Sequence, residues 1–194
     1  MTDALVIADL SGCPRLGFKG RGTLPAMQAR GLQLENKPNR AFRQADGSLC
    51  MVLAASEVFL LGAPGSDRDV LAELENSWSI ENNENTYPMP RRHSHAWFAL
   101  AGQAAPELLS KLCAVDLRTR AFDDLSIAQT SVARLNSIVV RADHGERQVY
   151  HLLADSAAST YMLICLNDAG REFGADIIDP LKFKSLELKS RLAG

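Results

Sequence analysis

The residues best suited to hold a metal ion lie near the middle of the chain. His93 and His95 are two positions apart. A strand would place both imidazoles on one face, where they could begin a metal site. His144, His151 or one of the scattered acids would have to supply a third ligand. A polar strand entrance explains the pair more simply, so we expect no bound metal.

Arg91 and Arg92 precede these histidines and complete the most basic short run of the chain. Such a run could bind a phosphate, a polyglutamate chain or an acidic partner surface. The simpler interpretation is the solvated end of a linker, with both arginines exposed.

The glycine-rich segment from Gly17 to Thr23 (GFKGRGT) resembles a phosphate-binding loop in composition. A P-loop requires G-x-x-x-x-G-K-[ST] between a strand and a helix, so that backbone amides converge on phosphate. Here Lys19 precedes the later glycines, and the dinucleotide pattern G-x-G-x-x-G is missing too. The segment is therefore predicted to be a structural turn.

The remaining reactive residue types also form no recognisable site. Asp123 and Asp124 are adjacent and favour a turn over paired acid–base catalysis. The serines lie outside G-x-S-x-G patterns. Four cysteines are too far apart for a zinc knuckle, and those in apolar helices are predicted to be small buried hydrophobes; they are Cys13, Cys50, Cys113 and Cys165. The sequence thus predicts no catalytic residue, no metal and no cofactor bound by this chain.

Composition sets broader limits. The chain has 194 residues, is 46% hydrophobic, and carries 21 Lys+Arg against 23 Asp+Glu. These values exclude a disordered or disulfide-scaffold protein, and the balanced charge argues against a nucleic-acid partner. The first residues lack a basic signal region, and no run of eighteen apolar residues could span a membrane. We therefore expect a cytoplasmic protein with reduced thiols and no membrane partner.

The secondary-structure elements that must position these residues differ between the start and the middle of the chain. The first 48 residues are rich in Gly and Pro, with a short helix expected near Leu24 and Met27. Alternation predicts strands at 49–54 and 57–62, joined as a hairpin. Ser66 or Asp67 is expected to cap a helix that runs to about Trp78. The polar segment 79–92, which contains Pro88 and Pro90, is predicted to be a linker or exposed loop.

Beyond that segment the pattern tightens. Strands are predicted at 94–101, 127–135, 138–141 and 148–154, the middle two either separated by a turn at Asn136 or continuous. One helix should begin near Pro106. Another, after Asp155 or Ser156, should present Tyr161, Ile164 and Cys165 on a broad apolar face and end at Gly174.

This order predicts an α+β fold of two small lobes, each an antiparallel sheet with helices packed on one face. The boundary is expected in the polar segment: residues 1–85 form the N-terminal lobe, and residues 86–194 the C-terminal lobe.

Several short motifs are distributed along the chain. They begin with RLGFKG at 15–20, Pro38-Asn39 and SEVFLL at 56–61. They continue with SHAWFALAG at 94–102 and end with Glu172-Phe173-Gly174. Together these motifs resemble the sarcosine oxidase gamma subunit family. The resemblance covers roughly residues 10 to 175 and leaves 176–194 without a counterpart.

The resemblance implies a small, non-catalytic chain of a heterotetramer with alpha, beta and delta subunits. Such a complex oxidatively demethylates sarcosine, with FAD, FMN, NAD and tetrahydrofolate held by the partner subunits. It also implies a fold like the folate-binding region of the glycine-cleavage aminomethyltransferases. Their catalytic acid cannot be aligned with this chain. The K-G-C-[YF]-x-G-Q motif of folate-binding iron–sulfur maintenance proteins is replaced here by Lys19-Gly20-Arg21-Gly22.

On this interpretation Phe18, Arg91, Arg92 and His95 are the candidate interface residues. Two other functions stay open: an independent tetrahydrofolate-binding aminomethyltransferase-like protein, and a binding module that dimerises through its aromatic residues.

Overall fold

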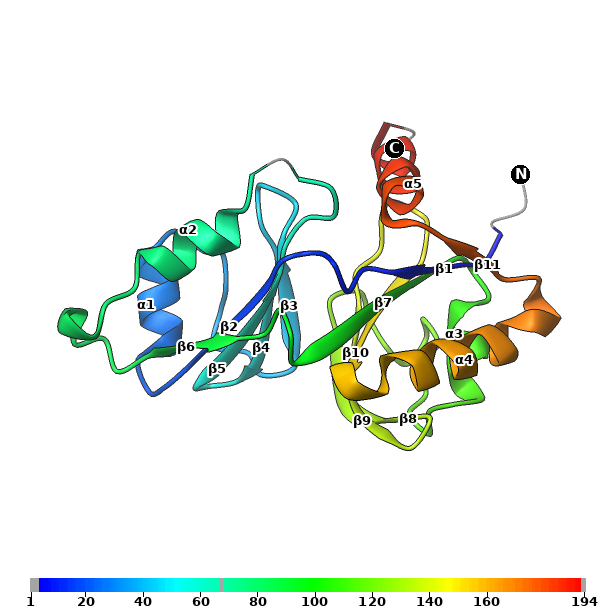
Figure 1. Cartoon of the computed structure of the whole chain (residues 1–194), viewed down its shortest axis with the longest axis horizontal. Helices are drawn as coiled ribbons and strands as arrows, with labels where there is room; N and C mark the ends of the chain where they lie inside the picture. The colour runs from blue at the N-terminus through cyan, green and yellow to red at the C-terminus, as the bar shows by residue number, and fades with distance from the viewer. Residues whose placement is uncertain (1–3, 67, 193–194) are drawn as a thin grey trace. The chain divides into compact units, whose positions relative to one another are not determined.

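The computed structural model describes residues 4–66 and 68–192, with the side chains of the last helix described as far as Leu186 (Figure 1). The chain forms two compact units. The first unit is Gly12–His93. The second unit combines the residues up to Ser11 with those from Ser94 onward.

The first unit is a five-stranded antiparallel sheet with two helices against one face. The strand order is β3-β4-β5-β2-β6. Its strands are β2 (Arg15–Lys19), β3 (Arg40–Arg43), β4 (Leu49–Ala54), β5 (Glu57–Leu61) and β6 (Tyr87–Pro90), and its helices are α1 (Thr23–Ala29), α2 (Val70–Asn76) and the short η1 (Ile80–Asn82). Alternate strand residues such as Phe18, Val52 and Leu60 form the core with Met27 of α1 and Leu71 of α2.

The second unit is a six-stranded sheet in the order β11-β1-β7-β10-β9-β8, antiparallel except that β11 runs parallel to β1. Its strands are β1 (Val6–Asp9), β7 (His95–Ala101), β8 (Ile127–Val132), β9 (Leu135–Arg141), β10 (Val149–Asp155) and β11 (Asp176–Ile178). Its helices are α3 (Ala105–Ser110), α4 (Ser159–Gly170), α5 (Pro180–Leu192) and the short η2 (Ser156–Ala158) and η3 (Arg171–Phe173).

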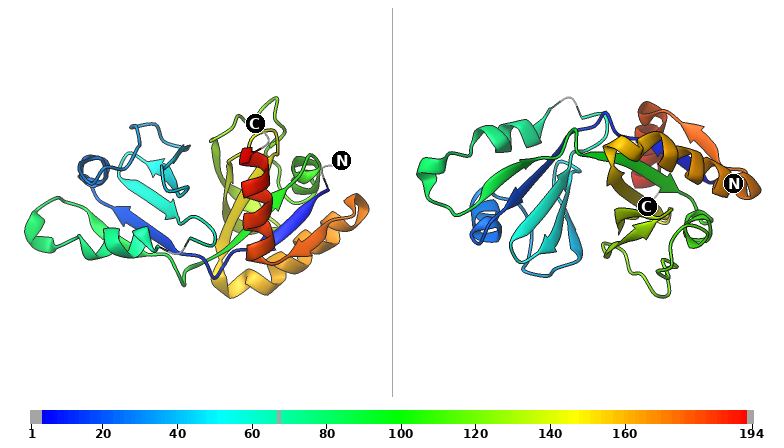
Figure 2. Two further views of the ribbon diagram at one scale, coloured as in Figure 1. Left: turned by 90° about the horizontal axis from the view of Figure 1, so that it is seen from above. Right: turned by 60° about the horizontal axis from the view of Figure 1, so that its bottom comes forward.

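Helices cover both faces of this second sheet. Phe98 and Leu152 pack with Met162 and Leu166 of α4 in the larger core. Phe183 of α5, 1% exposed, lies against His151, with ring centroids 6.5 Å apart. His151 follows Tyr150 and precedes Leu152 on β10, so it points to the face opposite α4. Helices α4 and α5 are the orange and red helices of Figure 2.

The predicted α+β class is therefore confirmed, as are the hairpin at 49–62 and the strand at 94–101. The division into units differs from residues 1–85 and 86–194 at two places. β6 pairs with β2 and stays in the first unit, whereas β1 pairs with β7 and joins the second. Strand pairing between distant segments decides this division, and local composition carries no signal for it.

Other predictions need correction. The segment 79–92 is not all loop, because β6 is an edge strand, where the missing amides of Pro88 and Pro90 are tolerated. The turn after β8 is at Ala133-Arg134, both with positive φ, and not at Asn136. Residues 176–192, unplaced from sequence, form β11 and α5.

Two helix predictions also change. Asp69 caps α2 by accepting a 3.0 Å hydrogen bond from the amide of Ala72. Of the expected caps, Ser66 lies before the helix and Asp67 lies outside the described residues. On α4, Tyr161 and Ile164 are 47% and 62% exposed, because the buried stripe runs through Met162 and Leu166.

Candidate functional site

An open groove of about 470 Å³ crosses the first unit. Its lining comes from the segment after α1, the turn between β3 and β4, and one side of α2. The apolar side chains are Leu32, Ala45, Leu60, Val70, Leu71 and Leu74. We call this surface the α2 groove.

The floor of the α2 groove is continuous with the core of the first unit. Leu60 on β5 and Leu71 on α2 are 1% and 5% exposed and belong to that core. Leu74 lies three residues, about one helical turn, after Leu71 and packs against the same cluster while it remains half-buried. The amphipathic pattern of α2 thus places one apolar row both in the core and in the groove.

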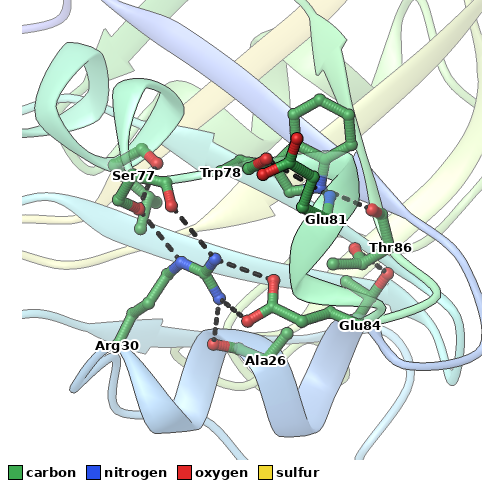
Figure 3. A network of polar contacts seen from close by, with 10 residues as sticks. Ala26, Arg30, Ser77, Trp78, Glu81, Glu84 and Thr86 are labelled. Carbon is green, nitrogen blue, oxygen red and sulfur yellow. Dashed lines mark hydrogen bonds and ion pairs between the residues drawn. The ribbon is translucent and has the colours of Figure 1, made fainter.

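A network of hydrogen bonds surrounds Arg30, which lines the groove together with Ser77 (Figure 3). Its guanidinium donates to both carboxylate oxygens of Glu84 at 2.8 and 2.7 Å, and to the carbonyl of Ala26 and the Ser77 hydroxyl, each at 3.0 Å. The Arg30 and Glu84 side chains are only 13% and 24% exposed. The hydrogen bond from Arg30 lowers the pKa of Glu84 below its ordinary value.

The segment that follows Ser77 is held at two further points. The indole Nε1 of Trp78 donates to the carbonyl of Thr86 at 2.7 Å. The hydroxyls of Thr23 and Thr86 hydrogen-bond at 2.8 Å. These contacts fasten residues 77–86, which connect α2 to β6, against α1.

Several polar side chains on the groove rim have hydrogen-bond partners within the chain. Arg68 donates to Glu73 at 2.7 Å. Asp46 accepts from the amide and hydroxyl of Ser48 at 3.0 and 2.6 Å. Gln44 exchanges two 2.8 Å hydrogen bonds with the backbone of residue 33. The formal charges of the groove lining sum to zero, from Arg30, Arg68, Asp46 and Glu73.

The glycine-rich segment packs against the segment that connects α2 to β6. Its Gly20 and Gly22 amides are bonded within the chain and are not available to a ligand. The amide of Gly20 donates to Ser56 and that of Gly22 to Asn85. A Cβ on Gly22 would lie 1.8 Å from the carbonyl oxygen of Glu84. The predicted structural turn is confirmed for residues 20–22, where only glycine allows this approach, whereas Gly17–Lys19 belong to β2 and Thr23 begins α1.

The predicted interface residues belong to both units: Phe18, Arg91 and Arg92 to the first, and His95 to the second. Phe18 is 0% exposed and belongs to the core, so its side chain is not available to a partner, contrary to the expectation. It lies on β2, which has neighbours on both sides, and alternation turns it toward the helices.

Arg91 and Arg92 have different roles. Arg91 is half-buried: it donates to Glu57 at 2.9 Å, and its guanidinium carbon lies 5.4 Å from the centre of the Phe59 ring. The expectation that both arginines are exposed is therefore wrong for Arg91. Arg92 is 52% exposed and pairs with Asp69 at 2.9 Å.

His93 and His95 do not share a strand, because β7 begins at His95. The Nδ1 of His95 is 2.8 Å from the hydroxyl of Ser94. His95 also lines a second pocket, of about 370 Å³, with Gln129, Asn136 and Leu153 among its neighbours. Among the described residues, no group of three or more His, Cys, Asp or Glu is arranged to hold a metal ion.

The acid Asp124 and the thiol of Cys50 have contacts typical of structural residues. Asp124 accepts a 2.9 Å hydrogen bond from the amide of Asp143. All four thiols are unpaired by disulfides. Cys50 is 0% exposed, and burial raises its pKa to about 12, so it stays a neutral thiol. In the described part of the chain, no helix is long and apolar enough to cross a membrane.

The α2 groove itself was not predicted. The apolar row of α2 was visible as helical periodicity, but it indicates only that the helix has a buried side. The turn around Ala45 and the segment at Leu32 line the groove together with α2. The folding of the sheet brings these segments together, and no single stretch of the sequence predicts that.

Comparison with known proteins shows the fold. No protein-family model and no curated protein sequence matches the chain. The heterotetrameric sarcosine oxidase from Corynebacterium sp. U-96, solved with pyrrole 2-carboxylate, contains a similar chain: TM-score 0.73, 20% identity, covering 92% of this chain and 89% of that one. Glycine cleavage system aminomethyltransferase T from Bartonella henselae gives TM-score 0.66 and 12% identity over 91% of this chain and 48% of that one.

This chain therefore spans about half the length of the aminomethyltransferase and nearly the full length of the matched sarcosine oxidase chain. Together with the two sheets and their helices, these matches place the chain in the aminomethyltransferase-like α+β fold that both structures contain.

Proposed function

We propose that this chain is a non-catalytic, gamma-type subunit of a heterotetrameric sarcosine oxidase or a close analogue. The observation that carries the proposal is the structural match to one chain of such a heterotetramer over about nine-tenths of both chains. Coverage that is nearly equal in both directions means that the two chains have similar lengths. The sequence motifs at 15–20 and 94–102 support the same family.

In this proposal the partners are alpha, beta and delta subunits, and they hold FAD, FMN, NAD and tetrahydrofolate. In this role the chain contributes interaction surfaces and no catalytic residues, and it is located in the cytoplasm. Two partly buried ion pairs support this role, because their charged side chains hold the fold: Arg30 with Glu84 and Arg91 with Glu57.

The test is assembly. The tagged chain is co-expressed with the alpha, beta and delta subunits encoded in its own genome, and the complex is isolated by affinity and size exclusion. We expect a stoichiometric complex that oxidises sarcosine and fails to form when this chain is omitted. If the chain elutes alone while the other subunits assemble without it, the proposal is wrong.

A second candidate function is favoured by the similarity to the aminomethyltransferase: an independent protein that binds tetrahydrofolate. It requires an acid poised beside the folate. The two acids that line the α2 groove are already engaged, Asp46 by Ser48 and Glu73 by Arg68. Calorimetric titration of the purified chain with tetrahydrofolate decides the matter. Saturable heat at a stoichiometry of one would favour this candidate over the subunit proposal.

A further inference from the structure

Three aromatic side chains meet where α5 packs on the second sheet. Trp97 on β7, His151 on β10 and Phe183 on α5 are 1%, 5% and 1% exposed. The indole Nε1 of Trp97 donates to the Nδ1 of His151 at 3.0 Å, and the two ring centroids are 5.6 Å apart. Phe183 approaches the same imidazole in a T-shaped contact. The imidazole of His151 therefore contacts both the neighbouring strand and the helix that covers this face.

The hydrogen bond from Trp97 fixes the protonation state of His151. An indole nitrogen only donates, so Nδ1 is the unprotonated nitrogen of a neutral imidazole. A second proton would have to bind at Nδ1, where it would set one N–H group against another. Both rings are almost completely buried, so water cannot replace the lost hydrogen bond while α5 stays in place. The docked helix therefore excludes this proton, because a buried donor without an acceptor is unfavourable.

The strands beside His151 present two aliphatic neighbours and one distant acid. Ala99 of β7 and Val140 of β9 are directly opposite His151 in the two ladders. Asp155 lies on the same face of β10, but it follows His151 by four residues, which is about 14 Å along a strand. It is opposite His95, the other titratable residue at that end of the two strands.

Helix α5 adds positive charge on its side of the sheet. Lys182 and Lys184 flank Phe183 in the sequence. The carboxylate of Asp179 caps the helix by accepting a 2.9 Å hydrogen bond from the amide of Lys182. A proton on His151 would add a cation beside a helix that already carries two at this point, and like charges repel.

Of the elements around His151, α5 requires the fewest broken contacts to move. β7 and β10 are adjacent strands inside the sheet, each with a neighbour on both sides. α5 instead follows β11, a strand of three residues at the edge of the sheet. Of the side chains from Leu181 to Leu186, only Phe183 is buried. Release of α5 therefore removes one buried side chain from the sheet, whereas separating Trp97 from His151 would break a ladder.

From this geometry we propose that α5 is an acid-released strap: uptake of one proton from solvent at the Nδ1 of His151 breaks the hydrogen bond from Trp97, and α5 leaves the sheet with Phe183. Loss of the proton restores the hydrogen bond and the docked helix. This switch is a property of the chain itself and does not depend on the proposed subunit function.

The expected size of the effect follows from linkage. An imidazole in water takes up a proton near pH 6.5, and here only the released state binds it. The ratio of released to docked α5 should therefore rise about tenfold between about pH 7.5 and about pH 5.5. The sign is fixed: acid favours release, because the released state binds the additional proton.

Hydrogen–deuterium exchange of the full chain, read by mass spectrometry, measures this release. Rates are corrected for the intrinsic effect of pH on amide exchange. We expect exchange in α5 to be about tenfold faster at the lower pH, and exchange in α4, on the opposite face of the sheet, to stay unchanged. Unchanged exchange in α5 would overturn the proposal. Equal acceleration in α4 would show that the whole unit opens, and would overturn it as well.

Three variants assign the effect to its atoms. His151→Gln keeps an acceptor for the indole but takes up no proton, so α5 should exchange at the docked rate at both pH values. Trp97→Phe removes the donor that excludes the proton, so the pH effect should shrink severalfold. His144→Gln, in the turn before β10, is the matched control and should keep the full response.

Thermal unfolding at the higher pH verifies that each variant is folded. A full pH response in folded His151→Gln or Trp97→Phe would assign the effect to another group and overturn the proposal. The comparison of α5 with α4 in the wild type needs no substitution, so it decides the matter even where a variant fails to fold.

Discussion

Replacing Glu84 by Gln tests how the first unit fastens the segment between α2 and β6 to α1. In the wild type, Arg30 donates two hydrogen bonds to this carboxylate, at 2.8 and 2.7 Å, with both side chains less than one-quarter exposed. Hydrogen bonds to charged groups contribute about 1.5–3 kcal/mol each when well formed. The loss of the negative charge leaves the half-buried guanidinium of Arg30 without an anionic partner, so we expect the free energy of unfolding to fall by about 2 kcal/mol.

A double-mutant cycle isolates the pair from its surroundings. Arg30→Met keeps the stem of the side chain and removes its charge, and it is combined with Glu84→Gln. Because residues in one network do not act additively, the double variant should be more stable than the two single effects predict, by about 1 kcal/mol. The measurement is urea denaturation at low ionic strength, followed by circular dichroism, since urea does not screen charge.

The exposed pair Arg68–Glu73 is the matched control. Its hydrogen bond of 2.7 Å is as short as those of Arg30, but the side chains are 72% and 53% exposed. Solvent screens such a pair, so Arg68→Met combined with Glu73→Gln should leave stability unchanged within error. Equal losses at the two sites would refute the argument from burial, and strict additivity at Arg30 and Glu84 would refute the pairing.

The stability that the Arg30–Glu84 pair contributes should depend on pH in a definite direction. Arg30 lowers the pKa of Glu84 in the folded chain, so the pair stabilises the fold fully above the ordinary glutamate pKa of about 4.3. This stability is lost as the pH falls through the lower, folded pKa. The difference between wild type and Glu84→Gln should therefore be greatest near pH 7 and shrink below about pH 4. A difference that grew on acidification would contradict the assigned direction.

Three further substitutions test other parts of the structure. Phe183→Ala removes the buried residue that packs α5 against the sheet and should cost about 3–5 kcal/mol in urea denaturation; a loss below about 1 kcal/mol would show that α5 does not depend on it. Gly22→Ala would collide with the carbonyl of Glu84 and should cost about 1–3 kcal/mol, whereas Gly12→Ala, with nothing within 4 Å, should be tolerated; similar melting temperatures for both would contradict the close approach. The folded pKa of Cys50, raised to about 12, means that the unfolded thiol ionises first; the stability of the wild type relative to Cys50→Ala should therefore fall as pH rises above about 8.5, and a constant difference would argue against burial of the thiol.

Local patterns predicted much of the secondary structure. The hairpin at 49–62 follows from alternation with a turn between the strands, and Pro106 marks the first turn of α3. These features depend on residues close together in the sequence. The turn at Ala133-Arg134 was missed although it is local, because neither residue type favours the positive φ that the hairpin pairing of Val132 with Leu135 imposes.

The sequence by itself determined the class of the fold, its balanced charge and the lack of a recognisable catalytic motif. Only the tertiary structure decided which residues are available to a partner. Phe18 and Arg91 are half of the four interface candidates, and both are taken up by the first unit: one in its core, the other in an ion pair with Glu57. The α2 groove appears only after β3–β4 pairing brings Ala45 beside Leu74. The physical reason is that burial depends on contacts between segments far apart in the chain, and the residue type and spacing within one segment do not encode them.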